Sequence, residues 1–308
     1  MSPVETMPKE NWWQAARSWI RSGTARRPGG IGLAFGGGFA RGIAHVGVLR
    51  ALEKHKIPIC AVSGVSSGAI VAAAIASGAT SYDIEKVALA MKFRDVARWT
   101  LNIMGLAGNE RMIPFLARLL KAGRFEDMQI PLAIVATDLI TGKAVTFHGA
   151  GDVMLPIRAS CAYPGLFSPI RYQGQLLVDG FVSMEVPAEP LLQMGADRVI
   201  SINIPNHDGI QDYGNMLSVV SRCFQVMGGR CEYNWRRYSK LVITPPVADM
   251  TWDSFASAKK LIECGEQAAM AAIPTILKWL PAPETVPASS KDAIPVAVSP
   301  ASDLSTTT

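Results

Sequence analysis

The sequence predicts an α/β fold, in which helices cover both faces of a mainly parallel β-sheet. Short apolar segments alternate with stretches of helical periodicity between residues 30 and 280. Hydrophobic residues make up 49% of the 308 residues and charged residues 18%, which suits a large core and excludes general disorder. Two glycine-rich turns each follow an apolar segment directly, as strand-to-helix connections do in such sheets.

The first half of this pattern is the clearest. Residues 31–35 are apolar and run into glycines, which is typical of a buried strand feeding a turn. Residues 43–54 carry apolar side chains at helical spacing and end in a basic stretch. A second apolar strand is expected at 58–62, and an Ala-rich buried helix at 69–77, with Gly78 as its stop.

The remaining elements follow from the same two periodicities. Residues 81–127 are expected to form amphipathic helices. Further strands are expected at 130–138, 143–148, 174–178, 198–204 and 241–244, with 143–148 as the hairpin partner of 130–138. Further helices are expected at 155–162, 187–194, 214–240 and 254–280. Active sites of such sheets lie at the carboxyl ends of the strands, so we expect the site there.

Both ends of the chain depart from this pattern, so the predicted domain covers residues 30–280. Residues 1–29 are polar and Arg-rich, and a helix there would carry Trp12, Trp13, Ala16 and Ile20 on one face. Docking of that face on the body, on a partner or on a membrane surface is left open, as is a disordered, solvated arm. Residues 281–308 are rich in Pro, Ala, Ser and Thr and are predicted to be a disordered tail.

Charge and cysteine content narrow the cellular setting. The net charge of +5 is mild, and no nucleic-acid partner is predicted. No apolar run reaches the ~18 residues of a membrane span, and no signal peptide is evident. The five scattered cysteines show neither a disulfide framework nor a metal-binding pattern, so no metal or other cofactor is expected. These features indicate a cytoplasmic protein, with peripheral contact to the inner membrane surface as an open alternative.

A serine lies in the first motif that could carry chemistry. Gly64-Val65-Ser66-Ser67-Gly68 matches the G-x-S-x-G pattern of a nucleophile elbow, and it stands between a predicted strand and a predicted helix. Such a turn strains the serine and exposes its hydroxyl above the amino terminus of the next helix, whose dipole favours negative charge. Gly64 and Gly68 must be small so that strand and helix can approach. The alternative is an ordinary Gly/Ser-rich turn.

The second motif is the glycine-rich segment 36–42, which follows the first strand. Its glycines Gly36, Gly37, Gly38 and Gly42 allow backbone N–H groups to point into a site without hindrance from a Cβ. Nucleotide binding is disfavoured, because the G-x-G-x-x-G spacing fails and Arg41 occupies the sixth position counted from the first glycine. An oxyanion hole for acyl transfer is favoured, because a nucleophile elbow follows shortly afterwards.

A serine nucleophile needs a base, and two arrangements are open. Asp179 ends a predicted strand and precedes Gly180, which would let the chain turn with the carboxylate facing the site. A partly desolvated position would raise the basicity of this group. A Ser66–Asp179–His207 triad is the formal alternative, but His207 lies in a polar stretch typical of a surface turn. His45 could orient the glycine-rich segment or serve as a buried structural histidine.

Taken together, these blocks resemble bacterial patatin-like phospholipases, close to the branch of the neuropathy target esterase catalytic domain. The resemblance rests on three motifs in order: the glycine-rich segment 36–42 with the helix after it, the elbow 64–68, and Val178-Asp179-Gly180 followed by Val186-Pro187. Residues 136–142 and 158–165 also resemble the family. The likeness spans about residues 30–205.

The resemblance implies a three-layer α/β/α sandwich and acyl-ester hydrolysis by a Ser66–Asp179 dyad. Phospholipids, lysophospholipids or simple acyl esters would be the substrates, and the N–H groups of Gly37 and Gly38 would form the oxyanion hole. Two positions depart from the family pattern, since Phe39 replaces its third glycine and Phe181 replaces Gly or Ala after Asp-Gly. A non-catalytic lipid- or partner-binding module with the same fold is the alternative function. The oligomeric state is left open.

Overall fold

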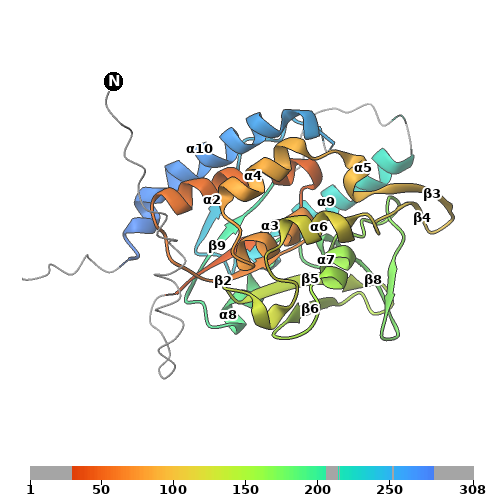
Figure 1. Ribbon diagram of the computed structural model, residues 1–308, viewed down its shortest axis with the longest axis horizontal. Coiled ribbons are helices and arrows are strands. Elements are labelled where there is room, and N and C mark those ends of the chain that lie inside the picture. The colour runs from red at the N-terminus through yellow and green to blue at the C-terminus, as the bar shows by residue number, and fades with distance from the viewer. Residues whose placement is uncertain (1–29, 206–213, 215, 252, 281–308) are drawn as a thin grey trace, which may run out of the picture.

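The computed structural model describes residues 30–205, 214, 216–251 and 253–280 (Figure 1). The expectations for the amino-terminal extension 1–29, for the tail 281–308 and for His207 concern residues outside this part of the chain.

An eight-stranded mixed sheet forms the centre of the protein. Its order is β10-β9-β1-β2-β5-β8-β7, with β6 paired to β5. The strands from β10 to β5 are parallel to one another, whereas β6 and β8 run antiparallel to β5, and β7 runs antiparallel to β8. The strand bounds are β1 Ile31–Phe35, β2 Ile59–Gly64, β5 Leu132–Asp138, β6 Ala144–His148, β7 Ile170–Tyr172, β8 Gln175–Asp179, β9 Arg198–Ile202 and β10 Leu241–Ile243.

Helices cover both faces of the sheet, which confirms the α/β class. The helix bounds are α2 Ala44–Lys54, α3 Ser67–Ala76, α4 Ser81–Ala90, α5 Phe93–Val96, α6 Met112–Leu119, α7 Met154–Ser160, α8 Glu189–Gln193, α9 Met216–Arg236 and α10 Ala258–Leu277. Short 3₁₀ helices occur at η1 Phe39–Ile43, η2 Phe125–Asp127, η3 Gly180–Val182 and η4 Phe255–Ser257. In Figure 1, α2, α4 and α10 lie on one side of the sheet and α8 lies on the other.

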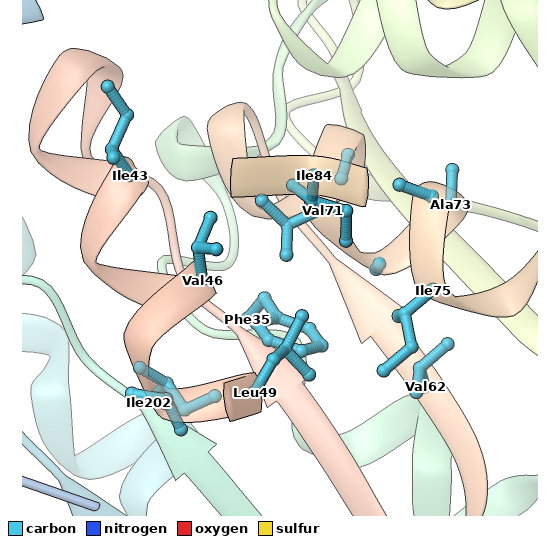
Figure 2. Packing of buried hydrophobic residues seen from close by; sticks show 14 of the residues in the cluster. Phe35, Ile43, Val46, Leu49, Val62, Val71, Ala73, Ile75, Ile84 and Ile202 are labelled. Carbon is cyan, nitrogen blue, oxygen red and sulfur yellow. The ribbon is translucent and has the colours of Figure 1, made fainter. Parts of the chain in front are cut away.

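Alternation of side chains along β1 explains the two layers. Leu33 and Phe35 point into the larger core, together with residues of α2, α3 and α4. Ala34 points the other way, into a smaller core where Leu191 of α8 packs. Figure 2 shows the larger core around the ring of Phe35; the residues labelled with it are Ile43, Val46, Leu49, Val62, Val71, Ala73, Ile75, Ile84 and Ile202. Burial on both faces is why these strands appear in the sequence as continuous apolar runs.

The segment 81–127 is not helical throughout, so that prediction is wrong for part of it. Residues Arg98–Asn102 (β3) and Gly105–Gly108 (β4) form a separate two-stranded antiparallel sheet. A hydrogen bond to a distant part of the chain stabilises this hairpin, because the Ala107 N–H donates to the Leu166 carbonyl at 2.8 Å. Strand β7 was also missed, and at three residues it is too short for its periodicity to show.

Candidate active site

Ser66 lies on a sharp turn between β2 and α3. Its backbone has φ 54° and ψ −126°, a conformation that L-residues rarely adopt and that persists only where the surroundings enforce it. The flanking glycines are required by close backbone contact. A Cβ on Gly68 would lie 2.3 Å from the Phe35 carbonyl oxygen, and one on Gly64 would lie 2.4 Å from the Gly68 carbonyl oxygen. The end of β1 therefore presses against the start of α3 and fixes the turn that presents Ser66.

The strained turn is also held by a buried serine that sequence reasoning did not single out. The Ser66 N–H donates to the Ser160 hydroxyl oxygen at 2.9 Å, and that hydroxyl donates to the Val135 carbonyl at 2.6 Å. Ser160 is fully buried at the end of α7. It therefore links the elbow to the middle of β5. Ser160 lies in the stretch 158–165, which resembles the family in sequence, but the sequence alone assigns no role to its hydroxyl.

The register of the sheet brings Asp179 to the height of Ser66. Gly64 in β2 lies opposite Ile134 in β5, and Ala136 in β5 lies opposite Asp179 in β8. Ser66 is two residues beyond Gly64, just as Ala136 is two residues beyond Ile134. Strand β8 is antiparallel to β5, so it starts near the carboxyl ends of the parallel strands and reaches the level of Ser66 at its last residue, Asp179. A parallel strand would instead end at the carboxyl edge of the sheet.

Every polar group of Asp179 except one carboxylate oxygen has a partner. Its N–H donates to the Ala162 carbonyl at 2.9 Å, and its own carbonyl accepts from the Thr137 hydroxyl at 2.9 Å. Oδ1 accepts from the Phe181 N–H at 2.9 Å. Oδ2 is buried and makes no hydrogen bond to any residue in the described part of the chain. The side chain is thus fixed with one oxygen left to accept a proton.

Burial raises the pKa of Asp179 to about 7, and the Phe181 N–H and the Ser66 hydroxyl oppose this rise. The Ser66 hydroxyl therefore lies close to the carboxylate, although no hydrogen bond of normal geometry joins it to Oδ2. Catalytic hydrogen bonds are often long when no substrate is bound, so this geometry is compatible with Asp179 acting as the base of Ser66. A carboxylate with a pKa near neutrality is a far better base than an ordinary aspartate.

The glycine-rich segment lies directly against the elbow. A Cβ on Gly37 would lie 3.4 Å from the Cβ of Ser66, and one on Gly42 would lie 2.2 Å from Oγ of Ser67. The guanidinium of Arg41 is not hydrogen-bonded to either proposed catalytic residue; it donates to the Pro205 carbonyl at 2.9 Å. Arg41 thus ties the segment to the chain after β9, and burial lowers its pKa.

The N–H groups of this segment differ in their availability. Gly36 N–H is bonded to the Ile202 carbonyl at 3.0 Å, and Gly37 N–H makes a long bond of 3.3 Å to the Glu185 carbonyl. No acceptor for the Gly38 N–H occurs among the residues that the structure describes. Within the described residues the Gly38 N–H is therefore unpaired, whereas the Gly37 N–H, next to Ser66, would have to give up or share a weak bond.

His45 holds the segment in place and is no proton acceptor for Ser66. Its Nε2 lies 2.9 Å from the Gly36 carbonyl, and burial lowers the pKa of His45 to about 4. The ring is therefore neutral near pH 7, and its Nε2–H donates to that carbonyl. The structure thus brings together Ser66, Asp179 and the segment around Gly37, with His45 behind the segment.

The two residues that depart from the family pattern both lie at the site. Phe39 has φ 52°, a left-handed conformation that glycine adopts without strain and phenylalanine does not. Its ring packs on Phe93 with a centroid distance of 6.2 Å. Phe181 follows the proposed base, and its ring lies between Gly37 and Gly228 of α9, 3.6 Å and 3.2 Å from the positions of added Cβ atoms.

A narrow apolar cavity of about 90 Å³ begins at Ser66. It passes between α2, α3, α4 and α6, which contribute aliphatic, aromatic and methionine side chains. Residues along it are Phe39, Ala40, Gly42, Ile43, Val46, Ser66, Ser67, Ile70, Val71, Ile84, Val87, Ala88, Met91, Val96, Met112, Phe115, Leu119, Cys161, Phe167 and Phe255. An apolar cleft beside a nucleophile suits a hydrocarbon chain attached to a reacting carbonyl.

The described residues form neither a metal site nor a membrane-spanning helix. No group of three or more His, Cys, Asp or Glu side chains there is placed to hold a metal ion. Within the same residues, no helix combines the length and apolar character needed to cross a membrane.

Comparison with known proteins identifies the family. Residues 33–192, just over half of the chain, match the family described as "Patatin-like phospholipase". The chain belongs to the patatin-like phospholipase family. This membership agrees with the three motifs, their order and the fold described above.

Relatives of this patatin-like protein include members of the neuropathy target esterase branch. An uncharacterized NTE family protein of Mycobacterium tuberculosis is 32% identical over 177 residues, covering 56% of this chain and 49% of that protein. Lysophospholipase NTE1 of Mycosarcoma maydis is 33% identical over 196 residues, covering 61% of this chain and 10% of that protein. Patatin-like phospholipase domain-containing protein 7 of Mus musculus is 30% identical over 199 residues, covering 61% and 15% respectively.

The patatin-like chain spans about half the length of the mycobacterial relative and much less of the others. Among solved structures, VipD from Legionella pneumophila has a TM-score of 0.49 and 16% sequence identity, over 80% of this chain and 67% of that chain.

Proposed function

We propose that this protein is a serine acyl-ester hydrolase of the phospholipase, lysophospholipase or carboxylesterase type, acting in lipid metabolism. Ser66 is the nucleophile and Asp179 is its base. One observation carries the proposal: a buried carboxylate with one unpaired oxygen and a pKa near 7 lies beside a serine in a strained strand-to-helix turn. Strain and an unpaired buried oxygen both cost stability, so a purely structural role would not explain them.

In the proposed reaction, the Ser66 hydroxyl attacks the ester carbonyl as its proton moves to Oδ2 of Asp179. The tetrahedral intermediate collapses to an acyl-enzyme, and the leaving alcohol or lysolipid takes the proton. Water then attacks the acyl-enzyme, gives its proton to Asp179, and the freed serine regains it when the fatty acid leaves. No metal takes part in these steps.

The amino end of the glycine-rich segment supplies the oxyanion hole in this proposal. The Gly38 N–H is the principal donor, because no described residue accepts from it. The Gly37 N–H is the second donor, and it is drawn from its 3.3 Å bond to the Glu185 carbonyl as negative charge develops. Oxyanion-hole donors typically contribute a factor of about 100 to 1000 to turnover. His45 and Arg41 position this segment without contacting the substrate.

The apolar cavity beside Ser66 suggests that the acyl group carries a hydrocarbon chain. Part of its wall comes from α4 and α6, which hold none of the proposed catalytic residues. Two relatives are named as a lysophospholipase and a phospholipase-domain protein, which supports a lipid substrate for this chain as well. We further propose that it acts in the cytoplasm, because all five cysteines are free, with contact of residues 1–29 to the inner membrane surface as an open alternative.

The test is fluorophosphonate labelling together with hydrolysis of p-nitrophenyl esters. Wild type should be labelled at Ser66, and Ser66→Ala should lose both labelling and hydrolysis. Asp179→Asn should lose at least ~100-fold in turnover, the lower range for a missing general base. Asp138→Asn is the matched control, because Asp138 is also a buried aspartate at a strand end, but both of its carboxylate oxygens already accept hydrogen bonds. The donors are the Ile140 N–H, the Thr141 hydroxyl and the Leu176 N–H.

Two outcomes would decide against the proposal. Hydrolysis that survives Ser66→Ala would exclude Ser66 as the nucleophile, and equal losses in Asp138→Asn and Asp179→Asn would show a structural effect only. If the folded wild type neither reacts with fluorophosphonate nor hydrolyses any ester, the non-catalytic lipid-binding alternative replaces the hydrolase.

The acyl-chain assignment has its own test in Ala88→Leu. Ala88 lies on α4 and lines the cavity, so a larger side chain would fill part of it. Long-chain esters should lose kcat/KM, whereas acetyl and butyryl esters should be hydrolysed as by wild type. An equal loss for all chain lengths would place the acyl chain elsewhere.

A further inference from the structure

The β3–β4 hairpin carries an unusual set of exposed apolar side chains. Ile103 at its tip is fully exposed, and Trp99, Met104 and Leu106 are 63%, 45% and 44% exposed. Figure 1 shows the hairpin extending beyond α5 and α6 at one end of the molecule. Single exposed hydrophobic residues are common, but four gathered on one short hairpin are of the kind that marks an interaction surface.

The hairpin is held firmly on the body of the protein. The Ala107 N–H donates to the Leu166 carbonyl, and the Ala107 carbonyl accepts from the Ser168 N–H at 3.2 Å. Gly105 packs so closely that an added Cβ would lie 2.4 Å from the Ser168 nitrogen. An isolated two-stranded hairpin is marginally stable in water, so these contacts supply its support. The apolar tip is therefore presented from a fixed base.

A row of aromatic rings connects the hairpin to the cavity beside Ser66. The ring of Trp99 lies 5.4 Å from that of Phe93, centroid to centroid. Phe93 in turn lies 6.2 Å from Phe39 and 6.4 Å from Phe167, and both of these line the cavity. The exposed apolar patch is thus continuous, ring by ring, with the place where we expect an acyl chain.

The surroundings of the hairpin are basic. Lys92, Arg94, Arg98 and Arg111 are all exposed on or next to it. Two acidic groups lie nearby: Asp95, whose carboxylate accepts from the Lys92 backbone N–H, and Glu110, which pairs with Arg158 at 3.6 Å. The cations therefore outnumber the acidic groups around the hairpin. Four cations around an apolar tip complement an anionic lipid surface.

We propose that the β3–β4 hairpin docks the protein on an anionic phospholipid surface. Trp99, Ile103, Met104 and Leu106 enter the boundary between headgroups and acyl chains, and the surrounding cations lie at headgroup level. Docking would bring the cavity mouth to the leaflet, so that an acyl chain could pass along Phe93 without crossing water. The docking itself does not rest on the proposed hydrolysis, whereas the passage of the acyl chain does.

The test measures binding of the full-length protein to vesicles by co-sedimentation. A Ser66→Ala background prevents turnover, and the vesicles are phosphatidylcholine with or without phosphatidylglycerol. Ile103→Asp and Leu106→Asp should each weaken binding to the anionic vesicles at least ~10-fold, because each removes a large apolar side chain from the lipid. Leu277→Asp is the matched control. Leu277 is 45% exposed at the carboxyl end of α10, at the opposite end of the molecule (Figure 1).

Several outcomes would overturn the proposal. These are no binding by the parent protein, equal effects of Ile103→Asp, Leu106→Asp and Leu277→Asp, or loss of binding only when Trp12 and Trp13 are both replaced by Ser. A dimer in solution that Ile103→Asp converts to a monomer would show that a second copy covers the patch. Hydrolysis of a soluble short-chain ester by Ile103→Asp, in a chain that keeps Ser66, should equal that of wild type. That readout separates failure of docking from failure of the proposed chemistry.

Discussion

Replacing Asp179 with Asn should stabilise the protein at neutral and alkaline pH while it removes the proposed base. The native carboxyl holds its proton up to pH about 7, whereas the ordinary value is 3.8. Unfolding therefore releases a proton between these values, so wild-type stability falls as the pH rises through this window. Asn cannot ionise, and its amide oxygen can still accept the Phe181 N–H that now binds Oδ1.

The magnitude follows from the two pKa values. At pH 3 the native and unfolded carboxyls are both protonated, so Asp and Asn should give nearly equal stability. The advantage of Asn should grow to about 2 kcal/mol at pH 5 and about 4 kcal/mol at pH 8, at roughly 1.4 kcal/mol per unit of separation between the pKa values.

Urea unfolding of Asp179→Asn and wild type, at several pH values between 4 and ~8.5, measures this difference. Asp138→Asn serves as the control, since hydrogen bonds lower the pKa of Asp138 and the sign of its effect should be opposite. In wild type, kcat/KM should rise with pH through about 7 as Asp179 loses its proton. A stability difference that does not change with pH, or an activity that is flat from pH 5 to ~8, would refute the raised pKa.

Two further substitutions test the support of the elbow. Ser160→Ala should leave the buried Ser66 N–H without its acceptor, which costs about 1–3 kcal/mol. It should also lower kcat more than it raises KM, and Ser160→Thr should restore part of the loss. Gly68→Ala should abolish fluorophosphonate labelling, because its Cβ would press on the Phe35 carbonyl. Gly229→Ala, in a helix position with open space around it, should be neutral or stabilising by up to about 1 kcal/mol in thermal unfolding.

The parallel core of the fold was predictable from the sequence because burial on both faces leaves a strong local signal. The strands β1, β2, β5 and β9 are mostly apolar, and the alternating helices are periodic. The β3–β4 hairpin left no such signal, because its pairing is supported by the chain around Leu166, about 60 residues away. Contacts that are distant in sequence cannot be read from local periodicity.

The position of Asp179 shows the same limit within the site. Its sequence context correctly indicated the end of a strand, but the direction of that strand depends on its pairing with β5. The antiparallel register, and not the carboxyl edge of the sheet, is what brings the carboxylate level with Ser66. Ser160 could not be found in this way either, since its hydroxyl reaches the elbow from 94 residues away.

Phe39 shows how the structure accounts for a departure that the sequence alone left open. Its left-handed backbone costs about 1–2 kcal/mol in any residue with a Cβ, whereas its ring joins Phe93 and lines the cavity. Phe39→Gly loses the ring but relieves the strain, and Phe39→Ala loses the ring and keeps the strain. The Gly variant should therefore be about 1 kcal/mol more stable than the Ala variant in urea unfolding, although glycine normally destabilises a chain relative to alanine. Both should lose activity on long-chain esters more than on acetyl esters, because both remove the same wall of the cavity. An Ala variant as stable as the Gly variant would show that the backbone at this position carries no strain, and the ring would then need no compensating role in the site.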